Sequence, residues 1–157
     1  MICTIVSGGT ELMQKYQNEH EKPYPEIKRR LREIIWELYS SGYDSFFLNC
    51  EYGIPLWAAE TICAMKMYND IKLNIVIPYE EQASNWCDEH RDRYFNVHSK
   101  ADSVIMADKH YCDDCYDRAD DIMIAESDLL TVFGKKRNGL YAESCARKKN
   151  IKIMYFQ

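Results

Sequence analysis

Small and hydroxyl-bearing residues follow the first apolar run of this chain, and they have the chemistry needed to contact a phosphate. The segment Ser7-Gly8-Gly9-Thr10 comes directly after the run. Its glycines would let the backbone approach a ligand closely, and its hydroxyls could donate hydrogen bonds to phosphate oxygens. The segment lacks the third glycine of a dinucleotide-binding fingerprint and the Gly-Lys-Ser/Thr end of a P-loop. We therefore weigh ligand contact against a tight turn with a purely structural role.

A second group of polar residues follows the next apolar run. Glu51, Tyr52 and Gly53 lead into a predicted helix, and Glu60 lies two turns further on, on the face that Gly53 shares. A helix N-terminus attracts anions, and a carboxylate at Glu60 could hold a ribose hydroxyl or orient a catalytic water. The alternative is that Glu60 is a charge on the helix surface.

A third group, containing Tyr79, Gln82 and Trp86, follows the apolar run that ends at Pro78. Gln82 and Trp86 are four residues apart, so they would share one face of a helix. An amide beside an aromatic plane could recognise a nucleobase. The alternative is that Trp86 belongs to the core and that Gln82 caps the helix.

The remaining reactive side chains do not form a recognisable metal or catalytic set. Cys112 and Cys115 make a lone C-x-x-C pattern, whereas a zinc site needs two more ligands and a thioredoxin-type pair needs a different place in the fold. We therefore predict no metal site. No serine sits in a nucleophile elbow. If the chain is an enzyme, Glu60 and Glu143 are the candidate acid or base residues.

Short apolar runs alternate with segments of helical spacing along the chain. Strands are predicted over 1–7, 45–50, 73–78, 103–107, 129–133 and 151–155, and helices over 26–39, 55–67, 83–100, 112–125 and 140–150. This alternation predicts an α/β fold, a Rossmann-like three-layer sandwich whose mostly parallel sheet carries helices on both faces. Ligands of such sheets bind outside the carboxyl ends of the strands, where the three groups of polar residues would lie. We expect one domain over residues 1–157.

The composition favours some partners and disfavours others. The net charge is −5, so we do not expect a nucleic-acid partner, which needs a basic face. No apolar run approaches the ~18 residues of a membrane span, so we expect a cytoplasmic protein with no membrane partner. Its seven cysteines should then be reduced. The twelve tyrosines and three tryptophans predict an aromatic surface that a homodimer would cover.

Two of these motifs together resemble a known family. Leu56-Trp57-Ala58-Ala59-Glu60 after one strand, followed by Pro78-Tyr79-x-x-Gln82-x-x-Asn85-Trp86 after the next, is similar to the SLOG superfamily, and within it to the YpsA-like branch of bacterial and phage proteins. A weaker match runs from Arg118 to Leu130. The resemblance implies a Rossmann-like sheet and a pocket for a nucleotide or nucleotide-derived ligand. It does not identify a cofactor.

The resemblance also implies which residues would line that pocket. Asn138 and Gly139 stand where the family has a richer Gly-Gly-Thr turn, and they join the three earlier groups. The expected ligand-binding residues are Ser7, Gly8, Gly9, Thr10, Glu51, Tyr52, Gly53, Glu60, Tyr79, Gln82, Trp86, Asn138 and Gly139. The chain lacks the Pro-Gly-Gly-x-Gly-Thr-x-x-Glu motif of the phosphoribohydrolase relatives, and bulky Glu51 and Tyr52 replace small residues, which would narrow the pocket or change its ligand.

Membership of the superfamily does not choose between an enzyme and a sensor, because its members include phosphoribohydrolases, a DNA-uptake protein that binds single strands, and sensor domains of defence systems. Our first hypothesis is a protein that binds a nucleotide-derived ligand as a sensor or scavenger. One alternative is an enzyme that cleaves or transfers at the N-glycosidic or phosphate bond of a nucleotide. A second alternative is a protein-interaction module that uses the tyrosine-rich surface.

Overall fold

Six parallel strands form one sheet in the computed structural model, which describes residues 1–9, 18–134 and 139–157. The strands are β1 (Ile2–Ser7), β2 (Ser45–Leu48), β3 (Lys72–Tyr79), β4 (Ser103–Asp108), β5 (Leu129–Phe133) and β6 (Lys152–Phe156). The described helices are α2 (Tyr24–Ser40), α3 (Ile54–Met65), α4 (Asp88–Lys100), α5 (Cys115–Ala125) and α6 (Tyr141–Lys148). Across the sheet the strands lie in the order β4-β3-β2-β1-β5-β6.

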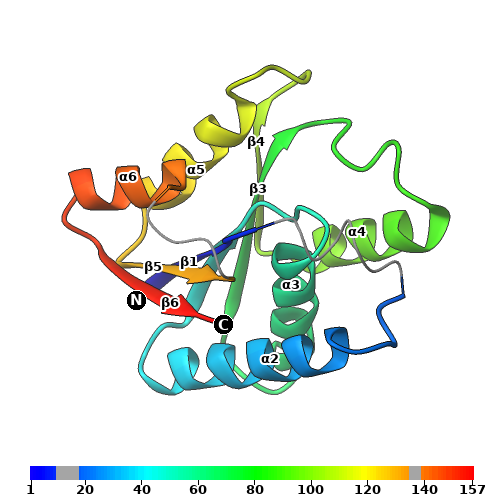
Figure 1. The fold of residues 1–157 in the computed structure, drawn as a ribbon, viewed down its shortest axis with the longest axis horizontal. Helices are drawn as coiled ribbons and strands as arrows, with labels where there is room; N and C mark the ends of the chain where they lie inside the picture. The colour runs from blue at the N-terminus through cyan, green and yellow to red at the C-terminus, as the bar shows by residue number, and fades with distance from the viewer. Residues whose placement is uncertain (10–17, 135–138) are drawn as a thin grey trace.

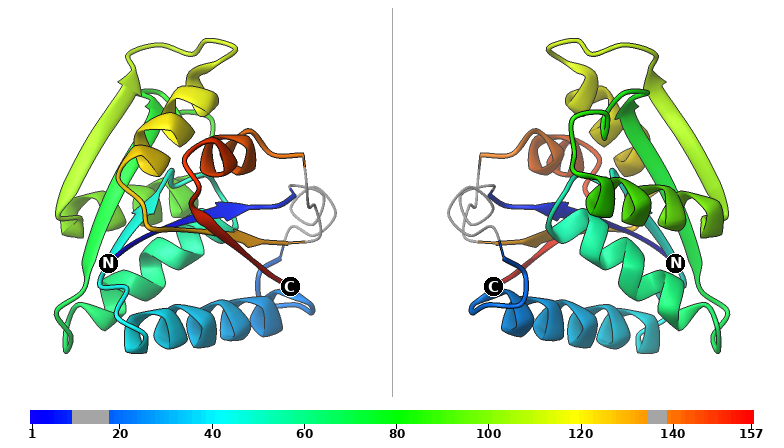
Figure 2. Two further views of the ribbon diagram at one scale, coloured as in Figure 1. Left: turned by 90° about the vertical axis from the view of Figure 1, so that its left-hand side faces the viewer. Right: turned by 90° about the vertical axis from the view of Figure 1, so that its right-hand side faces the viewer.

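Helices cover both faces of this sheet (Figure 1). On one face α3 packs against β1, β2 and β3, with α2 and α4 on either side of it. On the other face α5 packs against β3 and β4, while α6 packs against β5 and β6. The two side views show the sheet twisting between these helical layers (Figure 2). The predicted Rossmann-like three-layer sandwich is therefore confirmed.

The central position of β1 follows from its nearly continuous apolar sequence. Cys3 and Ile5 are buried in the cluster that includes residues of α2, α3 and α4. Val6 points to the opposite face and packs in a cluster with residues of α6. Because side chains alternate along a strand, both faces of β1 must be covered, as parallel sheets require.

The order of the strands places a topological switch point beside β1. From β1 the chain moves outward through β2 and β3 to β4 at one edge, and α5 then carries it back to β5 on the other side of β1. Ser7 at the end of β1 pairs in register with Phe133 at the end of β5. The carboxyl ends of these neighbouring strands border the crevice in which doubly wound folds bind ligands.

One predicted helix begins later than its pattern indicates. α4 starts at Asp88 rather than near Ala83, and residues 80–86 form turns. Gln82 and Trp86 therefore do not share a helical face, and the proposed amide-and-aromatic pair on one helix is wrong. None of the helices in the described part of the chain has the length and apolarity needed to cross a membrane.

Candidate ligand-binding site

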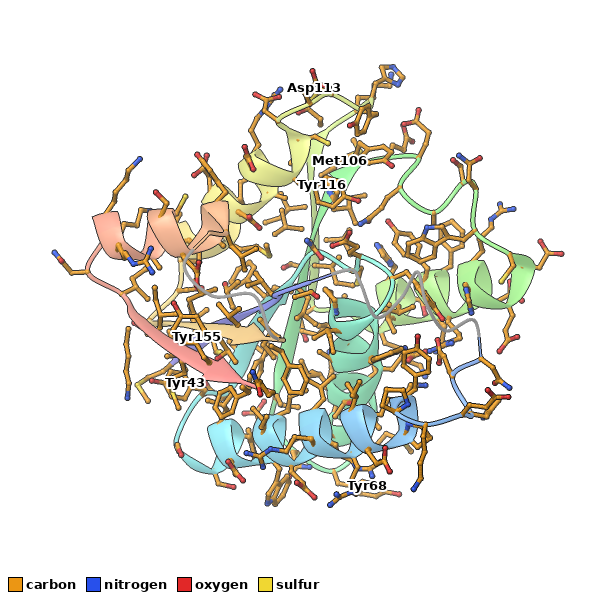
Figure 3. The ribbon with its side chains drawn as sticks, in the orientation of Figure 1. Tyr43, Tyr68, Met106, Asp113, Tyr116 and Tyr155 are labelled. Atoms are coloured by element: carbon orange, nitrogen blue, oxygen red, sulfur yellow. The ribbon has the colours of Figure 1, made fainter. Side chains whose placement is uncertain are left out.

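A cavity of about 300 Å³ opens at the carboxyl ends of β1 and β2, and we call it the switch-point pocket. The first turns of α5 and α6 form its other walls. Tyr116, labelled in Figure 3, contributes from the beginning of α5. The lining residues that the sequence predicted are Ser7, Gly9, Glu51 and Gly139, and those that it did not predict are Val6, Asn49, Tyr116, Asp117, Asp120, Leu140, Tyr141 and Ala142.

The turn after β1 and the turn after β5 approach each other closely beside the pocket. The Gly8 N–H donates to the Phe133 carbonyl at 2.8 Å. Gly134 has φ +136°, and a Cβ added to it would lie only 3.2–3.3 Å from the backbone of Gly8, so a side chain would push the two turns apart. Gly9 is different, because a Cβ added there meets nothing within 4 Å. Its backbone borders the open part of the pocket.

A hydrogen-bonded turn after β2 fixes the position of Glu51. The Asn49 side-chain oxygen accepts a hydrogen bond from the Glu51 N–H at 3.0 Å, and the backbone carbonyl of Asn49 accepts one from the Gln82 side chain at 3.1 Å. Gln82 is buried and in turn accepts from the Tyr94 hydroxyl at 3.0 Å. Gln82 therefore supports the turn from below rather than lining the pocket.

The pocket is acidic, and burial changes how its carboxyl groups titrate. Burial and the nearby charges of Asp117, Glu51 and Asp121 raise the pKa of Asp120 to about 7. Burial also raises the pKa of Glu51. Burial and the charge of Glu51 raise the pKa of the Tyr116 hydroxyl. Asp120 can therefore be protonated or ionised near neutral pH, whereas the Tyr116 hydroxyl keeps its proton there.

Glu143 has a structural task at the start of α6. Its side chain is fully buried, and one carboxylate oxygen accepts hydrogen bonds from the Gly139 N–H at 2.7 Å and the Leu140 N–H at 3.0 Å. A hydrogen bond with Glu143 also raises the pKa of Tyr155. Glu143 is thus the third residue of α6, and its carboxylate caps the start of the helix by accepting from the backbone of the N-cap residue Leu140 and of Gly139.

Glu60 lies outside the switch-point pocket, in a groove of about 480 Å³ between α2 and α3. Its carboxylate accepts two hydrogen bonds from Arg93, at 2.6 Å from Nε and 2.9 Å from Nη2. Arg93 also donates to Glu19 at 3.0 and 3.1 Å. Glu60 is therefore half of a bidentate ion pair and does not line the switch-point pocket.

Tyr52 and Trp86 lie beside this ion-pair network, whereas Tyr79 contacts Tyr116 of the switch-point pocket. The Tyr52 hydroxyl donates to Glu19 and its ring stacks on His90. Trp86 is half-buried against Tyr52. Tyr79 meets the rings of Tyr111 and Tyr116. Gly53 stands at φ 109° at the start of α3, a conformation that favours glycine.

Thr10 and Asn138 lie outside the described residues. Among the residues that the structure describes, no group of three or more His, Cys, Asp or Glu side chains is arranged to hold a metal ion. The Cys112 thiol instead donates to Asp108 at 3.2 Å and accepts from Arg118 at 3.3 Å.

Comparison with protein families decides the relationship that the motifs indicated. The model of the YpsA family, described as the YspA SLOG family, matches residues 8–153. The chain belongs to the YpsA SLOG family. Similar proteins include UPF0398 proteins of Bacillus cereus strain B4264 and Bacillus thuringiensis strain Al Hakam, each 30% identical over 141 residues, with 85% of this chain and 76% of the relative covered.

A solved structure extends the comparison of this YpsA-family chain to a nucleic-acid-binding protein. DNA processing protein A from Helicobacter pylori, whose structure concerns single-stranded DNA binding, superposes with a TM-score of 0.61 at 12% identity. The match covers 99% of this chain and 64% of that protein, so the chain spans less than two thirds of its length. The expectation that the negative net charge makes a nucleic-acid partner unlikely is wrong, because a protein of the same fold binds single-stranded DNA.

Proposed function

We propose that this YpsA-family protein binds a nucleotide or nucleotide-derived ligand in the switch-point pocket, as a sensor or scavenger. The observation that carries the proposal is the pocket itself, which combines an open glycine backbone at Gly9 with the carboxyl groups of Glu51 and Asp120 at the topological switch point. Its volume of about 300 Å³ is at the lower end of the range for small-molecule sites.

The charges of the pocket determine how such a ligand would be oriented. Glu51 and Asp120 are hydrogen-bond acceptors, so they suit ribose hydroxyls or the amino groups of a base. The rings of Tyr116 and Tyr141 offer flat surfaces beside them. A phosphate would be repelled by the carboxylates, and Glu143 already occupies the amides of Gly139 and Leu140. The remaining place for a phosphate is the Ser7–Gly9 turn at the pocket mouth, where the phosphate would have to replace the hydrogen bond that the Ser7 hydroxyl donates to the Gly9 carbonyl at 3.1 Å.

A nucleotide within single-stranded DNA is the second candidate ligand. The structural neighbour that binds single-stranded DNA supports this candidate. A strand would place one base and sugar in the pocket and leave its phosphates outside, away from the carboxylates. The hydrolase alternative gains no support from its two candidates, because Glu60 is ion-paired with Arg93 and Glu143 caps α6.

A thermal-shift screen tests the proposal and separates its two forms. The panel contains nucleoside monophosphates, NAD, ADP-ribose, cyclic nucleotides and a short oligothymidylate. A ligand at ~100 times its dissociation constant stabilises the fold by about 2.7 kcal/mol, which is a shift of several degrees. Stabilisation by free nucleotides supports the sensor or scavenger, and stabilisation by the oligonucleotide alone supports the second candidate.

The Gly9→Ala variant locates the binding event. The added methyl group fits the folded protein without a clash, so the unliganded melting temperature should stay the same. If a ligand approaches the Gly9 backbone, we expect at least a tenfold loss of affinity, about 1.4 kcal/mol. The matched control is Ser99→Ala on α4, which should bind like the wild type. A flat screen, or equal binding by both variants, would contradict the proposal.

A further inference from the structure

The strand at one edge of the sheet exposes consecutive large apolar side chains. Val104, Ile105 and Met106 of β4 are 46%, 39% and 46% exposed. β4 is the terminal strand of the sheet, so its outer backbone groups have no neighbouring strand in the described chain (Figures 1 and 2). Met106 lies toward the end of this strand in Figure 3. Proteins usually protect such an edge with lysine, proline or a covering helix, and none of these interrupts Ser103–Asp108.

The other edge of the sheet is protected. Ile153 and Tyr155 of β6 pack in the cluster that includes residues of α6, and Met154 and Phe156 pack against the main core. Lys152, which is exposed, begins that strand. Of the two edges of the sheet, β4 is therefore the one with exposed large apolar side chains, and it is the edge that a partner would cover.

We propose that β4 pairs antiparallel with β4 of a second copy of this chain, so that the two sheets form one continuous sheet across a two-fold axis. A two-fold axis perpendicular to the sheet keeps the helical layers of both copies aligned, so each residue meets one from the same face. With Ile105 on the axis, Ile105 meets its own symmetry mate and Val104 meets Met106 of the partner copy. Each exposed apolar side chain then has an apolar neighbour, and such cross-strand pairs stabilise a sheet.

The matching of apolar side chains selects this register over its neighbours. Centring the pair on Met106 would set Val104 opposite Asp108, and centring it on Val104 would set Met106 opposite Asp102. The Ile105 register pairs the three apolar residues only with one another, but it sets Asp102 opposite Asp108 of the partner copy, which is unfavourable for like charges. These carboxylates already have cations within their own chain, since Asp102 pairs with Lys66 and Asp108 pairs with Arg118 at 2.8 Å.

A second copy also fits the edge better than a head-to-tail arrangement does. Pairing of β4 with β6 of another molecule would leave both end molecules with open edges and would continue into a filament. Pairing of β4 with itself closes after two copies and removes the apolar edge from both. The closed dimer therefore covers all of the exposed β4 residues with no further growth.

Sedimentation velocity of the full chain tests the dimer. The wild type should sediment at twice the 18.6 kDa mass of the chain. Ile105→Lys places two like charges together on the axis and should raise the dimer dissociation constant at least tenfold. The fold of each copy should stay intact, so the melting temperature of the variant should be close to that of the wild-type monomer. Tyr68→Lys, on an 86% exposed side chain elsewhere, is the matched control and should remain dimeric.

Disulfide formation tests the register without depending on Ile105→Lys. In a Cys87→Ser background, which removes the exposed native thiol, Ile105→Cys should cross-link to its mate under mild oxidation, because opposite Cα atoms lie about 4.5–5.5 Å apart. Met106→Cys should cross-link poorly, since its mate would be offset by two residues. A monomer at all concentrations, a dimer insensitive to Ile105→Lys, growth beyond two copies, or preferential cross-linking at Met106 would each overturn the proposal.

Discussion

Asp120 and Glu51 give the switch-point pocket its electrostatic character. Both carboxyl groups are partly buried, and the pKa of Asp120 rises to about 7 because burial and the neighbouring charges of Asp117, Glu51 and Asp121 oppose its ionisation. Such a group costs stability when it is ionised in the folded protein. Binding sites often retain groups of this kind because a ligand that hydrogen-bonds to the carboxylate recovers part of the cost.

Replacing Asp120 with asparagine should therefore stabilise the unliganded protein at high pH. The unfolded carboxyl titrates near 3.9, so the wild type loses stability relative to Asp120→Asn as pH rises from about 4 to about 7. The difference in the free energy of unfolding reaches at most about 4 kcal/mol and then stays constant at higher pH. Each kcal/mol corresponds to a difference of roughly 2–4 °C in melting temperature. Melting curves from about pH 4 to 8 measure it.

The control for this change is Asp113→Asn, on an exposed residue of the loop before α5 (Figure 3). That variant should follow the wild type at every pH. A constant difference between Asp120→Asn and the wild type across the range would contradict the assigned pKa, since no titration would then separate the two proteins.

At the scale of elements, a network of charges joins α2, α3 and α4. Glu19 accepts hydrogen bonds from Arg93 of α4, from Lys28 of α2, and from Tyr52 before α3, and Arg93 also holds Glu60 of α3. Burial raises the pKa of Glu19, but the hydrogen bonds from Arg93, Lys28 and Tyr52 outweigh that effect and lower it to about 2. The network fixes the helices that cover one face of the sheet.

Arg93→Met should destabilise the protein by about 2–3 kcal/mol. The substitution keeps much of the side-chain volume but leaves Glu60 without its partner and Glu19 without one of its donors. The loss of stability stays below the roughly 3–5 kcal/mol of a fully buried pair, because the side chains of Arg93 and Glu60 are 22% and 30% exposed. Urea unfolding at about pH 7 measures the change, with Arg91→Met as the exposed control on the same helix. Equal losses in both variants would contradict the role of the network.

The same network makes the stability of the protein depend on pH under acidic conditions. Because the pKa of folded Glu19 is about 2 and its unfolded value is near 4.3, its contribution is present above about pH 4 and is lost as pH falls toward 2. Arg93→Met should therefore lose less stability between about pH 5 and 2 than the wild type does.

The elements were largely predictable from the sequence, whereas their contacts were not. Apolar alternation and helical spacing are local signals, so all six strands and the described helices fall near their predicted ranges. α4 is the exception, since Gln82 bonds to the backbone of Asn49 and this long-range contact holds residues 80–86 in turns. Glu60 likewise faces Arg93, a partner 33 residues away that no local pattern reveals.

At the scale of the whole molecule, the edge of the sheet that holds the pocket was predictable, but only four of the twelve described residues that line the pocket were. Ser7, Gly9, Glu51 and Gly139 follow strands or precede a helix, as the rule for parallel sheets requires. Tyr116, Asp117 and Asp120 join them only because α5 returns across the sheet to place β5 beside β1. The acidic first turn of α5, after a predicted strand, was the signal that could have found them.

The most direct test of the pocket is an amide chemical-shift titration of the nitrogen-15-labelled protein with ADP-ribose, whose base, riboses and phosphates span the proposed ligand class. We predict that the shifts which change on binding cluster at Gly9, Glu51, Asp120 and Leu140, around the switch-point pocket. Changes confined to the groove between α2 and α3, around Arg32 and Tyr68, would contradict this account, as would a spectrum that stays the same up to millimolar probe.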